Sequence, residues 1–328
     1  MIRALLRHSD GSIEPDVPRG RFASALAEPG GLIWVDLFNE PVETDERLLL
    51  DTFHFHPLAV DDAVQEVHVP KVDDWGGYLY LVLHSVSFAG GDGHRLRTSE
   101  LDVFLGPNFL VTHREEEMEC VEHTWSACLR DQRVFAGGAA RVLYHLVDEL
   151  VAGHMPAADA MDEALEAAEE RIIAKPVPAV LPEVLGLKRA LMHLRRVIAP
   201  QRDVLGRLAR DEYAVVPAAM RPYFRDVYDH LVRLYDIVES MRDLAAGVLE
   251  TYLSSINNRM NEVMKTLTLI TTFFMPISFV TGFFGMNFFS PAASPPAWTG
   301  KAFFAAVLAV ICALPGLMWL WLRKRNKV

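Results

Sequence analysis

The hydrophobic pattern is strongest at the C-terminal end of the chain. No Asp, Glu, Lys or Arg occurs in residues 266–300 or in residues 302–322. Each of these runs contains the roughly 20 mostly apolar residues that a helix needs to cross a bilayer. A buried core helix is the soluble alternative, but two such runs so close together favour two membrane spans. The pattern therefore predicts an integral membrane protein.

The first part of the chain mixes strand and helix signals. Apolar and β-branched runs predict strands, and Gly106-Pro107-Asn108 between two apolar runs predicts a hairpin. The predicted strands are residues 31–37, 78–88 and the two halves of 101–113, with helices at 43–55 and 57–66 between them. We expect an α/β domain with a small sheet that is mixed or largely antiparallel.

From residue 139 onward the pattern is helical and no strand signal returns. Residues 140–175 and 180–212 predict two antiparallel helices joined near Pro176 and Pro178. A third helix begins near Pro222 and meets no proline or glycine pair before the first span. If it continues to Phe284, its 60 or so residues extend roughly 90 Å at 1.5 Å each. One small domain cannot bury such a helix, so we expect it to pack against copies of itself.

These patterns predict an α+β cytoplasmic domain followed by a long stalk helix and two transmembrane helices. The stalk helix is expected to be continuous with the first transmembrane helix, at about residues 266–284. The expected segments are an α/β domain (1–138), antiparallel helices (139–216), the stalk and first span (217–284), an external loop (285–301), the second span (302–322) and a basic tail (323–328).

Basic residues at the chain end predict the orientation. Arg323, Lys324, Arg325 and Lys327 directly follow the second span, against Lys301 alone on the other side. The positive-inside rule places such a tail in the cytoplasm. Two spans return the chain to its starting side, so both termini are expected in the cytoplasm, with the spans in the plasma membrane, for a bacterium the inner membrane. We see no signal peptide at the N-terminus.

The net charge of −11 argues against nucleic acid as a partner and suits the gathering of cations. We find no nucleophile–base pair, no metal-ligand cluster and no phosphate-binding loop, so we do not expect an enzyme. Cys120, Cys128 and Cys312 show no metal or disulfide spacing, which fits a reducing cytosol.

A polar stripe follows the third helix in steps of three and four residues. This near-heptad spacing places its members on one face of a helix. The members are Glu250, Leu253, Asn257, Asn261, Met264, Thr268, Thr271, Met275, Ser278 and Gly282. Polar groups are costly against lipid, so the stripe must face other helices or water.

Spacing alone leaves a packing seam and a pore equally open for this stripe. Two details favour a pore. The stripe begins with a carboxylate and two amides on the cytoplasmic side, and methionines recur along it, which can gate a pore by dewetting. One chain with two spans cannot enclose a channel, so a pore requires a homo-oligomer.

The segment "NEVMKTLTLITTFFMPISFVTGFFGMNF" (261–288) resembles the signature of the CorA family of divalent-cation channels. The upstream segments "HPLAVDDAV", "PKVDDWGGYLYLVLH" and "PYFRDVYDHLVRLYDIVESMRDLAAGVLETYLSSINNRMNEVMK" resemble the same family, so the match covers most of the chain beyond about residue 30. The resemblance implies a funnel-shaped homopentamer in the lipid bilayer that carries Mg²⁺ down its electrochemical gradient and closes when cytoplasmic Mg²⁺ binds.

The resemblance also implies roles for particular residues. Gly285, Met286 and Asn287 would form the external selectivity filter. The pore would be lined by Asn261, Met264, Leu267, Met275, Ser278 and Gly282, with Leu267 in place of the Thr268 that spacing alone selects. Met264 and Leu267 would form a hydrophobic gate. Asp226 would bind regulatory Mg²⁺ between subunits, with an acidic partner near Asp92.

The sequence departs from the family pattern in the external loop. Residues 288–300 contain no acid, whereas many magnesium members have a glutamate shortly after the GMN motif, and Phe284 stands where a tyrosine is common. A Zn²⁺, Co²⁺ or Ni²⁺ transporter of the same superfamily, with or without coupling to protons, therefore stays open. So does a membrane-anchored oligomeric sensor or scaffold that carries no ion.

Overall fold

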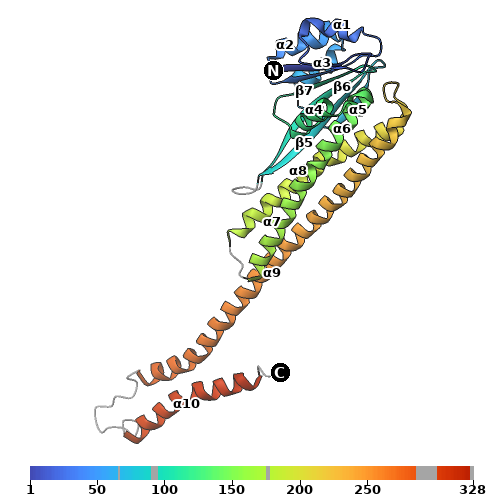
Figure 1. Ribbon diagram of the computed structural model, residues 1–328. Helices are drawn as coiled ribbons and strands as arrows, with labels where there is room; N and C mark the ends of the chain where they lie inside the picture. Colours follow the sequence, from blue (N-terminus) through green and yellow to red (C-terminus); the bar gives the residue numbers. More distant parts are fainter. Residues whose placement is uncertain (66, 90–94, 175–177, 286–300, 326–328) are drawn as a thin grey trace. The chain divides into compact units, whose positions relative to one another are not determined.

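The computed structural model describes the whole chain except residues 66, 90–94, 175–177, 286–300 and 326–328 (Figure 1). The chain divides into two units, Met1–Tyr252 and Leu253–Val328. The long helix α9 (Arg221–Gly285) runs from the first unit into the second.

The first unit is built on one seven-stranded sheet. Its strands are β1 (Ile2–Arg7), β2 (Ile13–Pro15), β3 (Leu32–Phe38), β4 (Lys71–Asp74), β5 (Leu79–Ala89), β6 (Arg95–Leu105) and β7 (Phe109–Arg114), in the order β2-β1-β3-β7-β6-β5-β4. β3 and β7 are parallel and the other pairs are antiparallel. The predicted mixed sheet is therefore confirmed.

The predicted hairpin is also confirmed. β6 and β7 pair with Leu105 opposite Leu110, and the Gly106 N–H donates to the Phe109 carbonyl at 3.0 Å. A Cβ at Gly106 would lie 2.2 Å from the Phe109 ring, so this turn lets the ring close over the backbone. The predictions for β3 and β5 hold as well. β1, β2, β4 and the first half of β6 were not predicted, because charged residues interrupt their apolar pattern.

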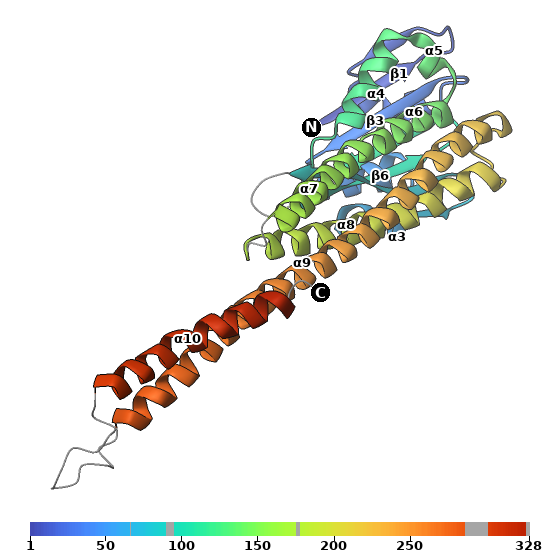
Figure 2. The ribbon, with the colours of Figure 1, turned by 90° about the horizontal axis from the view of Figure 1, so that it is seen from below.

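Helices cover both faces of the sheet (Figures 1 and 2). On one face lie α1 (Phe22–Leu26), α2 (Val42–Arg47), a π-helical stretch (Leu48–Thr52) and α3 (Pro57–Gln65). On the other lie α4 (Glu119–Arg130), α5 (Gln132–Ala136), α6 (Ala139–Ala152), α7 (His154–Ala174), α8 (Val180–Arg210) and the first part of α9. Short 3₁₀ turns occupy Arg19–Arg21 and Ala218–Met220.

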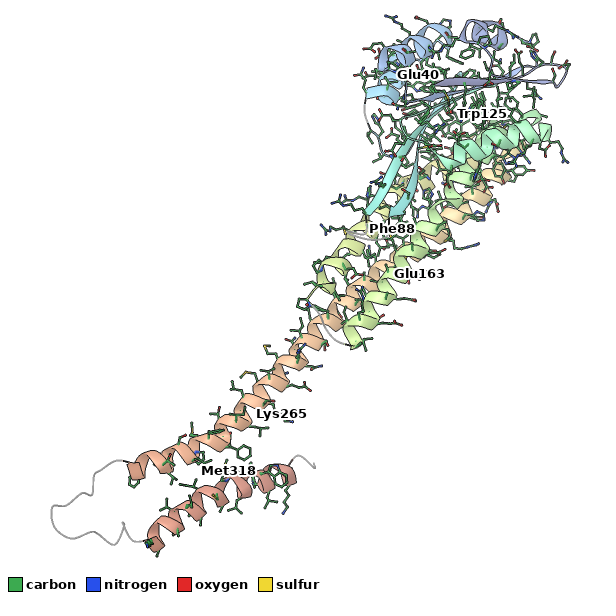
Figure 3. The ribbon with its side chains drawn as sticks, turned by 60° about the vertical axis from the view of Figure 1, so that its left-hand side comes forward. Glu40, Phe88, Trp125, Glu163, Lys265 and Met318 are labelled. Carbon is green, nitrogen blue, oxygen red and sulfur yellow. The ribbon has the colours of Figure 1, made fainter. Side chains whose placement is uncertain are left out.

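The apolar core has two parts, one on each face of the sheet. On the α1–α3 side, Phe22, Leu49 and Val60 pack with the sheet residues Ile33 and Tyr80. On the other side, α4 and α6–α9 share one cluster with the sheet. There the rings of Trp34 and Trp125 lie 4.9 Å apart, with Trp125 labelled in Figure 3. Residues 139–216 thus share a core with the sheet.

The prediction of a single helix over residues 140–175 is wrong, because the helix is interrupted at Gly153, between α6 and α7. The His154 ring Nδ1 lies 2.7 Å from the Leu150 carbonyl, the group that the His154 backbone N–H would use in a continued helix. Burial lowers the pKa of His154 to about 4, so the ring is neutral and donates from Nδ1. Gly153 caps α6 through its N–H to the Glu149 carbonyl.

The prediction of one uninterrupted third helix is confirmed, since α9 has 65 residues. Its early part buries one face in steps of three and four residues. The buried residues are Phe224, Val227, Leu231, Leu234, Val238, Met241, Ala245, Val248 and Tyr252. Tyr252 is the last buried residue of α9 among those the structure describes.

The second unit contains the rest of α9 and the helix α10 (Lys301–Arg325). Within the described residues, one helix, Ala218–Phe283, is long and apolar enough to cross a membrane, and none of its apolar window is buried. The apolar part of α10, Ala305–Trp321, is shorter. Lys265, labelled in Figure 3, is the last charged residue of α9 before the charge-free run.

Candidate functional site

The predicted stripe lies along one side of α9. At 3.6 residues per turn its ten positions and Leu267 occupy roughly a third of the helix circumference. All of these side chains are exposed in the single chain. Met264 and Leu267 are each 55% exposed and Met275 is 67% exposed, which is unusual for large apolar side chains. A continuous face of α9 is therefore free to meet other molecules.

This face is distinct from the face that α9 packs on its own domain. The buried residues end at Tyr252, and the next residue, Leu253, is already 59% exposed. Around the helix the two faces lie roughly a third of a turn apart. The first face holds the helix on the domain, whereas beyond Tyr252 the described side chains of α9 are exposed or partly exposed on every side, the stripe included.

The chemistry of the stripe changes along the helix. A carboxylate (Glu250) and two amides (Asn257 and Asn261) come first, followed by an apolar stretch that includes Met264 and Leu267. Two threonine hydroxyls, the sulfur of Met275 and the hydroxyl of Ser278 follow. The last described position is Gly282, where a Cβ would meet no atom within 4 Å. No formal charge lies on the stripe beyond Glu250.

The hydroxyl groups of Thr268 and Thr271 donate hydrogen bonds to backbone carbonyls of α9. Thr268 Oγ1 donates to the Met264 carbonyl at 2.7 Å, and Thr271 Oγ1 donates to the Leu267 carbonyl at 2.9 Å. A hydroxyl whose proton is used in this way presents only acceptor lone pairs to its surroundings. Sequence reasoning missed this polarity, because spacing shows which face a threonine occupies and not where its proton goes.

Several predicted site residues lie outside the described residues. Gly285 is the last residue of α9, so the helix leads directly to the predicted filter, but Met286 and Asn287 are not described. Asp92, the predicted regulatory partner of Asp226, is not described either. The choice between Leu267 and Thr268 stays open, since both are exposed on the two edges of the stripe.

Asp226 is exposed on the first turns of α9, among other charged groups. Across the helix interface, the carboxylate of Asp148 on α6 lies close enough to interact with it electrostatically. Burial raises the pKa of Asp148, His230 opposes that rise, and the carboxylates of Glu149 and Asp226 add to it. Asp148 was not singled out from the sequence, because only the packing of α6 on α9 brings it near Asp226. Within the described part of the chain, no three His, Cys, Asp or Glu side chains form a metal site.

Apart from the stripe and Asp226, a cluster of charged side chains is buried against the sheet. Asp36 is fully buried, with 0% of its surface exposed, and accepts hydrogen bonds from Arg3, Arg114 and Thr112. Arg3 and Arg114 both also pair with Glu122 of α4 at 2.8 Å. Every charge in this cluster has an opposite partner, which is how buried ions are tolerated. The cluster ties β1, β3, β7 and α4 together and is structural.

Comparison with known proteins connects this arrangement to one family. The sequence profile described as CorA-like Mg²⁺ transporter protein matches residues 29–324. YfjQ of Bacillus subtilis is 35% identical over 289 residues, which make up 88% of this chain and 87% of that protein. The cobalt/magnesium transport protein CorA of Thermotoga maritima is 32% identical over 275 residues, covering 84% of this chain and 77% of that protein.

Solved structures give the same result for the fold. The complete CorA magnesium transporter from Methanocaldococcus jannaschii superposes with a TM-score of 0.80 at 21% identity. The superposition covers 98% of this chain and 97% of that chain. The α+β domain and the long helix are therefore shared with that protein over nearly their full lengths.

Proposed function

The chain belongs to the CorA-like Mg²⁺ transporter family, and we propose that it carries divalent cations, above all Mg²⁺, across the membrane into the cytoplasm. The observation that carries the proposal is the exposed stripe of α9, which changes from carboxylate and amides to hydroxyls and sulfur and bears no charge within the membrane run. A face of this chemistry suits the wall of a water-filled path better than contact with lipid.

The proposed carrier is a homopentamer in which five copies of α9 turn their stripes toward a common axis. Supporting this, α9 is exposed beyond Tyr252, and the stripe within that exposed part carries amide, hydroxyl and thioether groups, while bulky apolar residues such as Phe274 and Phe279 lie off it. Met264 and Leu267 would form the narrow apolar gate. Gly285 and Met286 would present Asn287 at the external mouth, with both termini in the cytoplasm and α10 as the second span.

An amide ring suits Mg²⁺ because this ion gives up its water reluctantly. Carbonyl oxygens of the Asn287 side chains can accept hydrogen bonds from the water bound to the ion. A ring of carboxylates would hold a dication more tightly and slow its release. Weaker recognition of the hydrated ion allows both selection and passage.

The membrane potential supplies the driving force in this proposal. One charge that crosses 100 mV gains about 2.3 kcal/mol, so a dication gains roughly 4.6 kcal/mol. The sequence has no G-x-x-x-x-G-K-[ST] motif for nucleotide binding. Flux is therefore expected to follow the electrical and chemical gradients of the cation itself.

One observation favours a second candidate. The external residues 288–300 contain no acid, and Lys301 follows them, so cations are not concentrated at the mouth by local charge. A Zn²⁺, Co²⁺ or Ni²⁺ carrier is the alternative. Uptake of Mg²⁺, Zn²⁺ and Co²⁺ into liposomes that contain the purified protein, with and without a proton gradient, separates the two.

Regulation is the second part of the proposal: Mg²⁺ bound at Asp226, with Asp92 of a neighbouring copy, closes the pore when cytoplasmic Mg²⁺ is high. Replacing Asp226 by Asn should raise the internal Mg²⁺ concentration that halves the uptake by about fivefold or more, which is the low end of typical coupling between sites. Initial uptake into liposomes preloaded with graded Mg²⁺ measures this.

Asp236→Asn is the matched control, because Asp236 is another exposed carboxylate of α9. It should leave the inhibition curve unchanged. An Asp226→Asn curve that coincides with the wild-type curve would remove Asp226 from the regulatory site and leave the transport proposal intact.

A further inference from the structure

Thr271 is a polar residue that lies between two apolar residues along the stripe. Leu267 precedes it and Met275 follows it by four residues each, which places them about 6 Å below and above it along α9. Both of these neighbours are exposed on the stripe, at 55% and 67%. In a pore lined by this face, with Leu267 as the proposed gate residue in place of Thr268, a cation would meet an apolar ring, then a hydroxyl ring, and then another apolar ring.

The hydroxyl of Thr271 has a defined polarity. Its proton is directed to the Leu267 carbonyl at 2.9 Å, so the oxygen has only lone pairs left for other partners. Water bound to a cation turns its hydrogens outward and therefore needs acceptors. The same water around an anion turns its oxygens outward and needs donors. A ring of Thr271 hydroxyls thus favours hydrated cations.

We propose that Thr271 is a permeation-determining residue: five copies of its hydroxyl hold a hydrated divalent cation midway between the Leu267 and Met275 rings. This inference rests on the proposed transport function and adds a role inside the pore, away from the external filter. The ion keeps its first water shell at this position, since a hydroxyl acceptor recognises that water without replacing it. The ring divides one long apolar barrier into two shorter ones.

The chain offers a matched control in Thr266. Its Oγ1 donates to the Glu262 carbonyl at 2.9 Å, the same kind of bond that Thr271 makes, and its side chain is also exposed. Thr266 lies five residues earlier, which is roughly 140° around the helix from Thr271 and away from the stripe. Replacing either threonine by valine removes the same intrahelical bond, but only one replacement changes the stripe.

The experiment measures initial Mg²⁺ uptake into liposomes with the full-length wild type, Thr271→Val, Thr271→Ser and Thr266→Val. Size-exclusion chromatography in detergent confirms that all four assemble alike. Thr271→Val should lower uptake about tenfold, because one ordinary hydrogen bond lost from the transition state already has an effect of that order. Thr271→Ser and Thr266→Val should stay within about twofold of wild type.

Other outcomes overturn the inference. Thr271→Val uptake equal to wild type removes the hydroxyl from permeation. Equal losses in Thr271→Val and Thr266→Val trace the effect to the helix, and a loss in Thr271→Ser traces it to the methyl group. Each of these leaves the proposed function standing, because the wild type transports in all of them. A wild type that carries no divalent cation refutes the proposed function itself.

Discussion

Replacing Asn287 by alanine is expected to lower Mg²⁺ uptake by about a hundredfold, which corresponds to about 2.7 kcal/mol in the barrier. In the proposed pore the five amide oxygens are the groups that recognise the hydrated ion where it enters. Alanine removes all five acceptors and leaves an apolar mouth beside Phe288. Initial rates of Mg²⁺ entry into liposomes, at equal amounts of reconstituted protein, measure the loss.

Asn258→Ala is the control for this prediction. Asn258 is an exposed amide of α9, one residue after Asn257 and off the stripe. Its removal should leave uptake within about twofold of wild type. If Asn287→Ala carries Mg²⁺ as fast and as selectively as wild type, the amide ring has no role, and the reading of the chain as an anchored sensor or scaffold gains support.

The second large effect concerns stability. Asp36→Ala should destabilise the first unit by about 3 kcal/mol, because it leaves the buried Arg114 guanidinium without its main carboxylate partner. Glu122 still pairs with Arg114, which keeps the cost near the lower end for a broken buried ion pair. For a unit of this size the thermal midpoint should fall by roughly 6–12 °C. Circular dichroism of the full-length protein in detergent follows the transition.

An exposed ion pair provides the comparison. Arg202 and Asp203 contact each other at 3.2 Å on α8, with the Asp203 side chain 72% exposed. Asp203→Ala should change the free energy of unfolding by less than about 1 kcal/mol, since exposed pairs contribute little. Equal midpoints for Asp36→Ala and wild type would mean that the buried cluster does not hold the sheet to α4.

The elements that could be predicted from the sequence are those with local causes. α9 was predictable because no proline or glycine pair interrupts its pattern between Pro222 and the first span. β3 and β5 are long apolar runs, and the β6–β7 turn carries Gly106. The interruption between α6 and α7 also has a local signal in Gly153 and Pro156, which the prediction of one helix overlooked. The contact of the His154 ring with the Leu150 carbonyl, in contrast, depends on burial against the rest of the domain.

The same division holds for the candidate site. The stripe follows from residue spacing alone, and the structure places its described members on one exposed face of α9. The proximity of Asp148 to Asp226 depends on the packing of two helices far apart in the sequence. The direction of the Thr271 proton depends on a side-chain rotamer. Neither of these two features can be inferred from the amino-acid sequence.

The central claim is that the stripe of α9 lines a path for Mg²⁺. The most direct measurement is the initial rate of Mg²⁺ entry into liposomes that contain only the purified full-length protein. A potassium diffusion potential, negative inside, is applied without a proton gradient. Mg²⁺ entry should increase with the potential. Zn²⁺ entry that requires a proton gradient, with no Mg²⁺ entry under any potential, would contradict it.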